Sequence, residues 1–501
     1  MSHKTKEQLT KEAEALWATL KDRTLSPKDR MGIPAQEMPA REPLKRAREM
    51  DEVALGYSDE QARVEAARCL GCKNRPCVAA CPVGVPIPEF IACVQSGDYA
   101  SAVATIKTAN LLPAICGRVC PQERQCQSQC TLGKSLKDVD KSVAIGRLER
   151  FVADWERENG LVRPPEVAKA TGKKVAIVGS GPAGLTVAAD VRRAGHEVTI
   201  FEAFHKTGGV MVYGIPEFRL PKAIVAKEVE TLKAMGVTFR TNYLVGRTET
   251  IENLLDREGF DAAFIGTGAG LPKFMDIEGE NLIGVFSANE YLTRANLMKA
   301  YDTSRAATPL YEAKTVGVVG GGNVAMDACR MALRLGAEKV YCVYRRTRGE
   351  MPARAEEIAH AEEEGVEFLF LRNPTKIVGD ETGRVRAVEL LEYELGEPDA
   401  SGRRSPVARA GTEYELPVDA MIVALGNESN PLMAQTTAGL EVTKRGNIVV
   451  DGKQRTSLKR VWAGGDIVLG AATVILAMGE GRKAAASINA YLAGDEQDQA
   501  D

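Results

Sequence analysis

Apolar residues recur at every third or fourth position through much of the stretch from Ser58 to Glu158. This spacing places them on one face of a helix and predicts a small helical domain. Two such runs are Phe90, Val94, Ala100 and Val103, and Ile145, Leu148, Phe151 and Val152. Residues 1–50 differ in character. They are charged and interrupted by four prolines, which favours an extended arm, a partner-contacting segment or a mobile tail.

Beyond the link Arg163–Pro164–Pro165, the pattern changes to strands that alternate with helices. Strand-like runs at 174–179 and 197–202 flank a helical pattern, and the same arrangement recurs at 315–320 and 339–344. Two such units predict two Rossmann-like nucleotide-binding domains. A length of 501 residues suits about three domains. The predicted fold class is therefore α/β, with an N-terminal helical domain at 1–160 followed by two nucleotide-binding domains.

Residues 383–412 contain Gly396, Pro398 and Gly402 and predict a hairpin with a loose tip, to which we assign no chemistry.

Charge and composition narrow the classes of partner. The formal charge is −3, from 65 basic and 68 acidic side chains, so no overall field favours nucleic acid or an anionic membrane. No apolar run approaches the roughly 18 residues that a spanning helix needs, and Met1–Thr10 has no apolar core of a signal peptide. We therefore expect a soluble cytoplasmic protein that binds neither nucleic acid nor membrane.

Nine of the eleven cysteines fall between Cys69 and Cys130, which suggests metal binding rather than disulfides. The spacings are Cys69-x2-Cys72-x4-Cys77-x3-Cys81-Pro82 and Cys116-x3-Cys120-Pro121-x4-Cys126-x3-Cys130. Each run resembles a ferredoxin-type ligand string, so two iron–sulfur clusters with crossed ligation are predicted. Two zinc sites are the alternative, because Cys-x2-Cys pairs also suit Zn²⁺. Cys93, Cys329 and Cys342 lie outside these spacings and are expected to be buried free thiols.

The first glycine fingerprint, Gly179-Ser-Gly181-Pro-Ala-Gly184, follows a strand and opens a helix, and Glu202 ends the next strand. Such glycines let the backbone approach a pyrophosphate, and the carboxylate can accept hydrogen bonds from a ribose. A purely structural tight turn is the alternative. The candidate ligands include Pro182 and Ala183, which lie inside the fingerprint.

A late motif, Val461-Trp-Ala-Gly-Gly-Asp466, indicates FAD as the dinucleotide at this fingerprint. Gly465 and Asp466 can lie against its ribityl and phosphate portion, and the following helix can stabilise negative charge on a reduced isoalloxazine. Thr473 and Val474 are the candidates nearest the ring. The FAD domain is then discontinuous, at 161–286 and 428–501, and the second nucleotide domain is inserted at 287–427.

The second fingerprint runs from Gly320 to Asp327 and ends its glycine pattern in alanine, a permitted variant. Its candidate ligands are Gly320, Gly322, Asn323, Val324 and Ala325. Tyr344 occupies the place of Glu202, and Arg345 and Arg346 follow at once, which suits a 2′-phosphate and predicts NADPH. The alternative is that both arginines form surface ion pairs.

Several segments together closely resemble one family. They are Arg68–Cys77, Cys81–Pro88, Ile115–Glu123, Ile145–Phe151, Gly208–Gly209, Tyr213–Pro221 and Glu350–Arg354. The family comprises the small (beta) subunit of glutamate synthase, the large subunit of NADH-dependent ferredoxin:NADP oxidoreductase and the N-terminal half of dihydropyrimidine dehydrogenase. The resemblance covers nearly the whole chain and adds Gly209 to the candidate FAD ligands.

The resemblance also implies how the cluster ligands divide. One [4Fe–4S] cluster would take Cys69, Cys72, Cys77 and Cys130. The other would take Cys81, Cys120 and Cys126, with Glu149 in the place where dihydropyrimidine dehydrogenase has a glutamine. Counting cysteines alone gives two all-thiolate sites, so the alternative is Cys116 as the fourth ligand, with Glu149 a surface residue beside Arg147 and Arg150.

The expected reaction is hydride exchange between NADPH and FAD, followed by single-electron transfer through the Glu149-associated cluster and then the all-cysteine cluster. No cysteine lies between Cys130 and Cys329, so the chain lacks the redox-active pair of disulfide-reducing flavoproteins. None of the four histidines, His3, His196, His205 and His360, falls in an acid–base constellation, and we predict no catalytic side chain.

The resemblance leaves the redox partner open. A glutamate synthase would require a separate large subunit, since nothing here supplies glutamine hydrolysis or an FMN barrel. The alternative is the large subunit of an electron-bifurcating enzyme that pairs with a small flavin and [2Fe–2S] subunit and with ferredoxin. A third hypothesis is a non-catalytic scaffold that binds the same groups only to fold or to present a docking surface.

Overall fold

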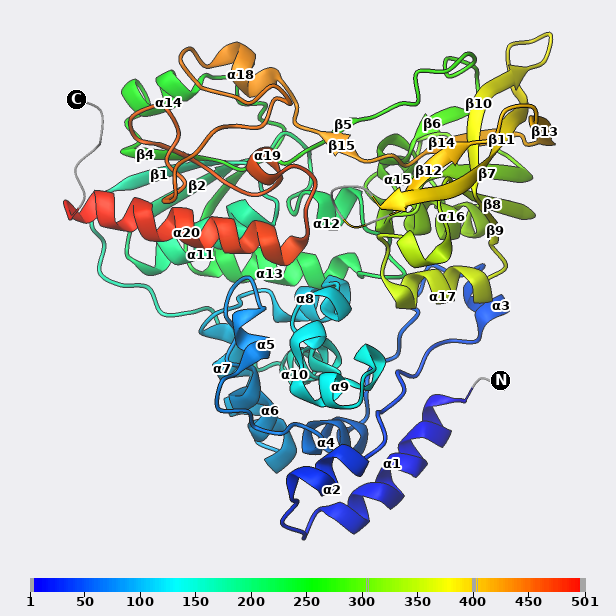
Figure 1. Cartoon of the computed structure of the whole chain (residues 1–501). Coiled ribbons are helices and arrows are strands. Elements are labelled where there is room, and N and C mark those ends of the chain that lie inside the picture. Colours follow the sequence, from blue (N-terminus) through cyan, green and yellow to red (C-terminus); the bar gives the residue numbers. More distant parts are fainter. Residues whose placement is uncertain (1–3, 303, 305, 399–401, 403, 496–501) are drawn as a thin grey trace.

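The computed structural model describes residues 4–302, 304, 306–398, 402 and 404–495, which form three lobes (Figure 1). The N-terminal lobe is helical, as predicted. Its main helices are α4 (Asp59–Ala67), α6 (Ile87–Ser96), α7 (Tyr99–Lys107), α8 (Pro113–Val119) and α10 (Ile145–Glu158). The apolar faces of α4, α6, α7 and α10 share a core that includes Phe90, Val94, Leu148 and Val152, whereas the apolar residues of α8 join the core of the first nucleotide-binding lobe. The cysteine-containing segments between these main helices include two short helices, α5 (Pro76–Ala79) and α9 (Thr131–Ser135).

The expectation of an extended or mobile arm is wrong for the first part of residues 1–50. Residues Lys6–Leu20 form helix α1, which starts at a capping box between Thr5 and Gln8 and buries Leu9, Ala13 and Leu20. The prolines do not break these helices. Pro27 and Pro43 occupy the first position of α2 (Pro27–Gly32) and α3 (Pro43–Arg46), where the missing N–H costs no helical hydrogen bond.

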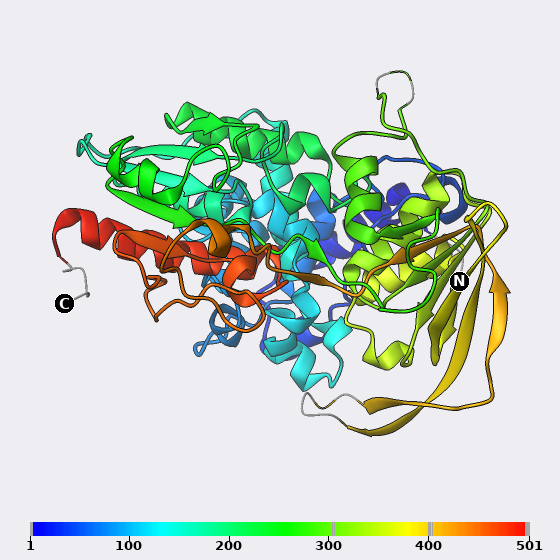
Figure 2. The same cartoon turned by 90° about the horizontal axis from the view of Figure 1, so that it is seen from above.

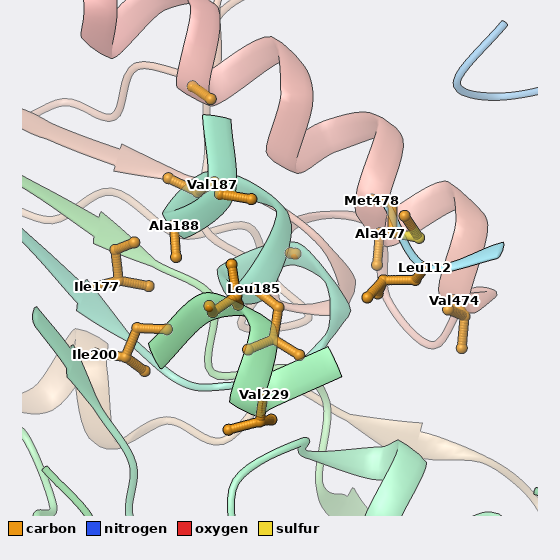
Figure 3. Packing of buried hydrophobic residues seen from close by; sticks show 14 of the residues in the cluster. Leu112, Ile177, Leu185, Val187, Ala188, Ile200, Val229, Val474, Ala477 and Met478 are labelled. Atoms are coloured by element: carbon orange, nitrogen blue, oxygen red, sulfur yellow. The ribbon is translucent and has the colours of Figure 1, made fainter. Parts of the chain in front are cut away.

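The first nucleotide-binding lobe is built on a parallel sheet in the order β16-β4-β1-β2-β3. Its strands are β1 (Lys174–Val178), β2 (Glu197–Phe201), β3 (Thr238–Arg240), β4 (Ala262–Ile265) and β16 (Val461–Ala463). Helices α11 (Pro182–Arg193), α13 (Lys222–Ala234) and α20 (Val474–Ala493) contribute to one apolar cluster, and Figure 3 shows Leu112 of the helical lobe beside Ala477 of α20. Because β16 pairs with β4, the two distant chain segments complete one sheet.

The second nucleotide-binding lobe has a parallel sheet in the order β6-β14-β7-β8-β9. Its strands are β6 (Val285–Ser287), β7 (Thr315–Val319), β8 (Lys339–Tyr344), β9 (Glu367–Phe370) and β14 (Ala420–Val423), with helices α15 (Ala288–Asn296), α16 (Asn323–Arg334) and α17 (Ala355–Glu363). A two-stranded link of β5 (Leu271–Pro272) and β15 (Asn427–Glu428) joins the two lobes. The boundaries expected at 286/287 and 427/428 therefore fall inside β6 and β15.

The hairpin expected at 383–412 is formed by β11 (Val385–Pro398) and β12 (Arg404–Ala408). It belongs to an antiparallel sheet with β10 (Arg372–Gly379) and β13 (Tyr414–Pro417), which lies at the outer side of the second lobe (Figure 2). Its tip, at residues 399–401 and 403, lies outside the described residues. Within the described chain, no helix is both long and apolar enough to cross a membrane.

A buried charge network fixes the second lobe against the rest of the chain. The carboxylate of Glu364, whose side chain is fully buried, accepts hydrogen bonds from Arg46, Arg330 and Arg334 at 2.7–3.0 Å. Arg46 comes from the N-terminal segment, and Figure 1 shows α3 beside α17. The arginines hold the pKa of Glu364 well below its usual range, against the opposing effect of burial.

Substitution of Glu364 by glutamine should destabilise the fold by about 3 kcal/mol, because it removes the carboxylate paired with Arg334 and one of the two carboxylates paired with each of Arg46 and Arg330. Since the folded pKa is depressed, this stabilisation is present above the unfolded pKa of about 4.3 and is lost as pH falls toward the folded value. Thermal melting of both proteins from pH 7 down to about pH 2 tests this, because the difference between them should narrow only below the unfolded pKa of about 4.3. Equal melting temperatures of Glu364→Gln and the parent at pH 7 would contradict it.

Candidate functional site

A cavity of 720 Å³ runs from the first glycine fingerprint to the second. From the first lobe it is lined by Gly179, Gly181, Pro182, Ala183, Glu202, Gly209, Tyr213, Gly465, Asp466, Thr473 and Val474. From the second lobe it is lined by Asn323, Val324 and Asp327. The volume lies within the range of natural cofactor sites. One continuous space therefore reaches both places where a dinucleotide is expected.

Each of the three glycines in the first fingerprint is required for a different structural reason. Gly179 has φ +102°, and a Cβ there would lie 2.5 Å from the carbonyl oxygen of Gly266. A Cβ at Gly184 would lie 2.1 Å from the oxygen of Gly179, so this glycine lets α11 pack close to the strand. A Cβ at Gly181 would meet no protein atom within 4 Å. Because Gly181 lines the cavity, only a bound molecule would contact a side chain there.

Glu202 is held in place at the end of β2. Its Oε2 accepts hydrogen bonds from the backbone N–H of Ser180, at 3.0 Å, and from the Ser180 hydroxyl, and its Oε1 accepts one from the N–H of Phe204 at 2.9 Å. Gly209 has φ +54°, and a Cβ at this position would lie 2.8 Å from Gly181 Cα, so the two glycine backbones pack closely together. These contacts place the carboxylate and the fingerprint backbone against the same part of the cavity.

Beside the first fingerprint, Gly465 and Asp466 lead from β16 into the short helix α19 (Asp466–Leu469), and a Cβ at Gly465 would lie 3.0 Å from Ala183 Cβ. Burial raises the pKa of Asp466 to about 6, although the Ala472 backbone N–H favours the carboxylate. Thr473 caps α20, since its hydroxyl accepts from the N–H of Leu476 at 3.3 Å. The positive end of α20, a helix of 20 residues, therefore faces the cavity, where it can stabilise an anionic ring.

In the second fingerprint, Asn323 and Val324 line the cavity, whereas Gly320, Gly322 and Ala325 lie behind them. Gly320 has φ +144°, and a Cβ there would come within 2.5 Å of the Ala424 oxygen. A Cβ added at Gly322 would meet only Pro352, whose Cγ would lie 3.9 Å away. The first turn of α16 is thus open to a ligand from the cavity side.

The structure separates the two arginines that were expected to bind a 2′-phosphate. Arg345 is exposed after β8, whereas Arg346 is 6% exposed and donates from Nε to the Arg404 carbonyl oxygen of β12 at 2.8 Å. Arg346 thus holds the hairpin against this loop. Arg345 is the better candidate for the phosphate.

Replacing Arg345 by glutamine should raise the KM for NADPH about tenfold while leaving the KM for NADH nearly unchanged, because only NADPH carries the extra phosphate. Steady-state kinetics with both coenzymes measure this. Arg386→Gln, an exposed arginine paired with Glu415 on the outer sheet, is the control. Parallel changes with both coenzymes would show that Arg345 does not read the phosphate.

The spaced cysteines line two separate pockets in the helical lobe. The first is lined by Cys69, Cys72, Cys77 and Cys130. The second is lined by Cys81, Cys116, Cys120 and Cys126, together with Glu149. These are the two groupings that the family resemblance implies, with both candidates for the last ligand in the second pocket. Among the remaining cysteines, Cys329 and Cys342 are buried as expected, but Cys93 is only half-buried.

The cysteine side chains line both pockets, although within the described residues they are not already grouped as a metal site. Burial raises the pKa of Cys69, Cys77, Cys81 and Cys126, and Cys116 and burial together raise that of Cys120. The thiolates that cluster ligation requires would therefore need a nearby cation, which coordinated iron supplies. The surrounding walls are apolar and include Ile87, Val85 and Phe90.

Asn110 is a site residue that sequence reasoning missed. It is fully buried, donates from Nδ2 to Glu149 Oε1 at 2.6 Å, and lies with its Oδ1 3.8 Å from Cys116 Sγ. Burial raises the pKa of Glu149 to about 8, against the effect of the Asn110 amide. Asn110 thus orients the carboxylate in the second pocket. The sequence around Asn110 gives no signal of this role, because the role depends on contacts with Glu149 and Cys116 that only the folded chain makes.

The dinucleotide cavity and the second cysteine pocket share a wall. Val474 lines the cavity, and the adjacent Ile475 lines the pocket. Likewise, Val119 lines the cavity, and the adjacent Cys120 lines the pocket. One turn further along α20, Met478 Sδ lies 3.6 Å from Cys116 Sγ. The second pocket therefore lies directly beside the end of the cavity that Val119 and Val474 line, where the flavin ring is expected.

The fold and the site define a flavin-dependent pyridine nucleotide oxidoreductase that carries an iron–sulfur domain. Residues 173–481 match the family model of pyridine nucleotide-disulphide oxidoreductases, and residues 46–161 match that of dihydropyrimidine dehydrogenase domain II, 4Fe-4S cluster. The chain belongs to the glutamate synthase small-subunit family. It is an NADPH-dependent flavin and iron–sulfur oxidoreductase, so the zinc and scaffold alternatives are set aside.

Two relatives illustrate the range of the family. The chain is 37% identical over 467 residues to the glutamate synthase [NADPH] small chain of Azospirillum brasilense, covering 91% of this chain and 95% of the relative. It is 41% identical to the NADP(+)-dependent formate dehydrogenase subunit beta of Moorella thermoacetica, with 83% of this chain aligned, but spans only 60% of that protein. The fold also resembles Mycobacterium tuberculosis FprA in complex with NADPH, at a TM-score of 0.54 and 20% identity, over 64% of this chain and 85% of FprA.

Proposed function

We propose that this chain is the NADPH-oxidising subunit of a glutamate synthase, holding FAD and two [4Fe–4S] clusters and delivering electrons to a separate large subunit. The shared wall between the dinucleotide cavity and the second cysteine pocket is the observation that carries this proposal. The near-complete alignment with glutamate synthase small chains supports the choice of partner. The bound groups supply hydride and single-electron chemistry.

The side chains divide the work of binding and positioning. The backbone around Gly181 and the carboxylate of Glu202 hold the pyrophosphate and ribose of FAD, and Asn323 and Val324 hold NADPH at the other end of the cavity. Thr473 fixes the start of α20, which faces the flavin end. The residues that would hold the clusters are Cys69, Cys72, Cys77 and Cys130 in one pocket and Cys81, Cys120, Cys126 and Glu149 in the other.

Cysteines that are neighbours in the sequence line different pockets, which is the crossed ligation expected for two clusters. Cys77 lies within α5 and Cys81 two residues after its end, yet they line different pockets. Cys126 and Cys130, which flank the 3-10 helix Gln127–Gln129, are divided in the same way. The second pocket borders the cavity, so we assign it to the cluster that first receives electrons. The first pocket then lies nearer the partner.

A different redox partner is the second candidate. The similarity to a formate dehydrogenase subunit beta favours it, because that relative is as similar over the aligned length as the glutamate synthase chains. The bifurcating alternative would also have another partner, a small flavin and [2Fe–2S] subunit. In each case this chain would keep the same internal groups.

The partner can be identified by anaerobic purification of the tagged full-length chain from its native cell, followed by mass spectrometry of whatever co-purifies. A large subunit with amidotransferase and FMN-barrel sequence is the expected result. A formate dehydrogenase subunit or a small flavin and [2Fe–2S] chain would instead remove the glutamate synthase assignment. Untagged cells processed in parallel control for adventitious binding.

A further inference from the structure

Arg354 lies where the second nucleotide-binding lobe meets the loop that carries Cys120 and Cys126. It is 6% exposed and immediately precedes α17, within the loop Glu350–Arg354 that follows β8. None of the steps described above uses it. Its contacts nevertheless reach both the nucleotide fingerprint and the second cysteine pocket.

On one side, Arg354 is bonded to the nucleotide fingerprint. Its backbone N–H donates to Asn323 Oδ1 at 2.9 Å. Asn323 is the first residue of α16 and lines the dinucleotide cavity. A nucleotide bound at the start of α16 would therefore contact a residue that is directly hydrogen-bonded to Arg354.

On the other side, the Arg354 guanidinium is bonded to the cysteine-bearing loop. Nη1 donates to the Arg118 carbonyl oxygen at 2.8 Å, and Nη2 donates to Gln122 Oε1 at 3.1 Å. Gln122 is 5% exposed and lines the second cysteine pocket beside Cys120 and Glu149. A chain of hydrogen bonds through Asn323, Arg354 and Gln122 thus leads from the cavity to the pocket.

The two loops are joined by further bonds, so the connection is stiff. Arg124 Nη2 donates to the Met351 carbonyl oxygen at 2.8 Å, and the N–H of Ala355 donates to Glu123 Oε1 at 3.3 Å. Gln122 is also confined, because a Cβ at Gly146 would overlap its amide. A shift of Asn323 on nucleotide binding would therefore pass to Gln122 rather than dissipate in a mobile loop.

We propose that Arg354 is a positioning residue that couples the nucleotide fingerprint to the second cluster, so that nucleotide occupancy and the redox state of that cluster influence each other. The coupling rests on the proposed function, since it requires a cluster in the second pocket. Coupling between sites is reciprocal. A nucleotide that changes the midpoint potential must therefore bind the oxidised and reduced forms with different affinity.

The test is an EPR-monitored redox titration of the full chain with and without 2′,5′-ADP, which carries the 2′-phosphate and lacks the reducible ring. The signal of the second cluster is assigned as the one missing from Cys126→Ala. Typical couplings begin at about fivefold in affinity, so we expect the potential to shift by about 40 mV in the parent. Arg354→Met and Gln122→Leu should each reduce this coupling to less than about twofold.

Two matched variants separate the explanations. Arg334→Met removes another buried arginine that tethers α16 to the N-terminal segment, through the Glu49 carbonyl oxygen at 2.8 Å, but touches neither Gln122 nor Asn323. It should keep the coupling. Arg354→Lys keeps the charge but has one nitrogen in place of Nη1 and Nη2, so it cannot reproduce the fork that reaches Arg118 and Gln122 from two positions and should lose the coupling.

Several outcomes would overturn the proposal. They are the absence of a nucleotide-dependent shift in the parent, a full shift in Arg354→Met, or loss of the shift in Arg334→Met. Failure of the proposed function gives a different result. If the second pocket held no cluster, the EPR spectra of Cys126→Ala and of the parent would be the same. A full shift in Arg354→Lys would show that charge alone acts, and would also reject the hydrogen-bonded mechanism.

Discussion

Replacing Gly181 by leucine should yield a folded protein that contains no flavin and oxidises NADPH at least about a hundredfold more slowly, because the cofactor carries the chemistry. Gly181 has φ −68°, which any residue adopts, and its Cβ would point into open space on the cavity wall. The added side chain would occupy the place of the pyrophosphate. Flavin content by absorbance, together with circular dichroism of the same sample, measures both parts of the prediction.

The control is Gly184→Ala, three residues away in the same fingerprint. Its Cβ would overlap the Gly179 oxygen, so this smaller substitution should lower the melting temperature of the flavin-free protein, whereas Gly181→Leu should lose only the stability that bound FAD contributes. Normal flavin content in Gly181→Leu would mean that the pyrophosphate does not lie against this glycine.

Glu149→Ala should remove the second cluster and leave the first intact, lowering the iron content from about eight to about four atoms per chain. The carboxylate lies in the second pocket and is oriented by Asn110 at 2.6 Å, so its loss leaves only Cys81, Cys120 and Cys126 beside Cys116. Iron analysis and EPR after anaerobic purification provide the measurement. Hydride transfer from NADPH to the flavin should survive in this variant.

Cys116→Ala is the matched experiment, since the Cys116 thiol lies 3.8 Å from Asn110 Oδ1 in the same pocket. This variant should keep its full iron content. If Cys116→Ala loses the iron and Glu149→Ala keeps it, the pocket is an all-thiolate site and the family-based ligand set is wrong for this chain.

Local sequence was sufficient for features that depend on spacing along the chain. The glycine fingerprints marked where α11 and α16 begin, because close approach of strand, helix and ligand admits no side chain at those positions. The cysteine spacings also indicated two ligand sets. Pairing of β16 with β4 could be expected only because the late Gly465–Asp466 motif implied a return of the chain to the first sheet.

Features that depend on distant contacts could not be read from the sequence. Asn110 and Arg354 acquire their roles from partners 39 and 31–236 residues away, and nothing in their own neighbourhoods indicates this. Arg345 and Arg346 look equivalent as neighbours, yet the hairpin captures only one of them. The helix at Lys6–Leu20 was missed because the prolines that follow it suggested irregular chain, although its capping box was a local signal.

Helix α20 gives the protein a definite order of maturation. The cysteines of the second pocket are synthesised early, but Ile475 completes that pocket and Val474 completes the flavin cavity. A nascent chain that has not yet released α20 from the ribosome therefore leaves both places open to water and oxygen. The second pocket and the cavity are therefore enclosed only once residues 474 and 475 have folded onto the segments before them, whereas the first pocket, lined by residues between Cys69 and Ile145, does not depend on α20.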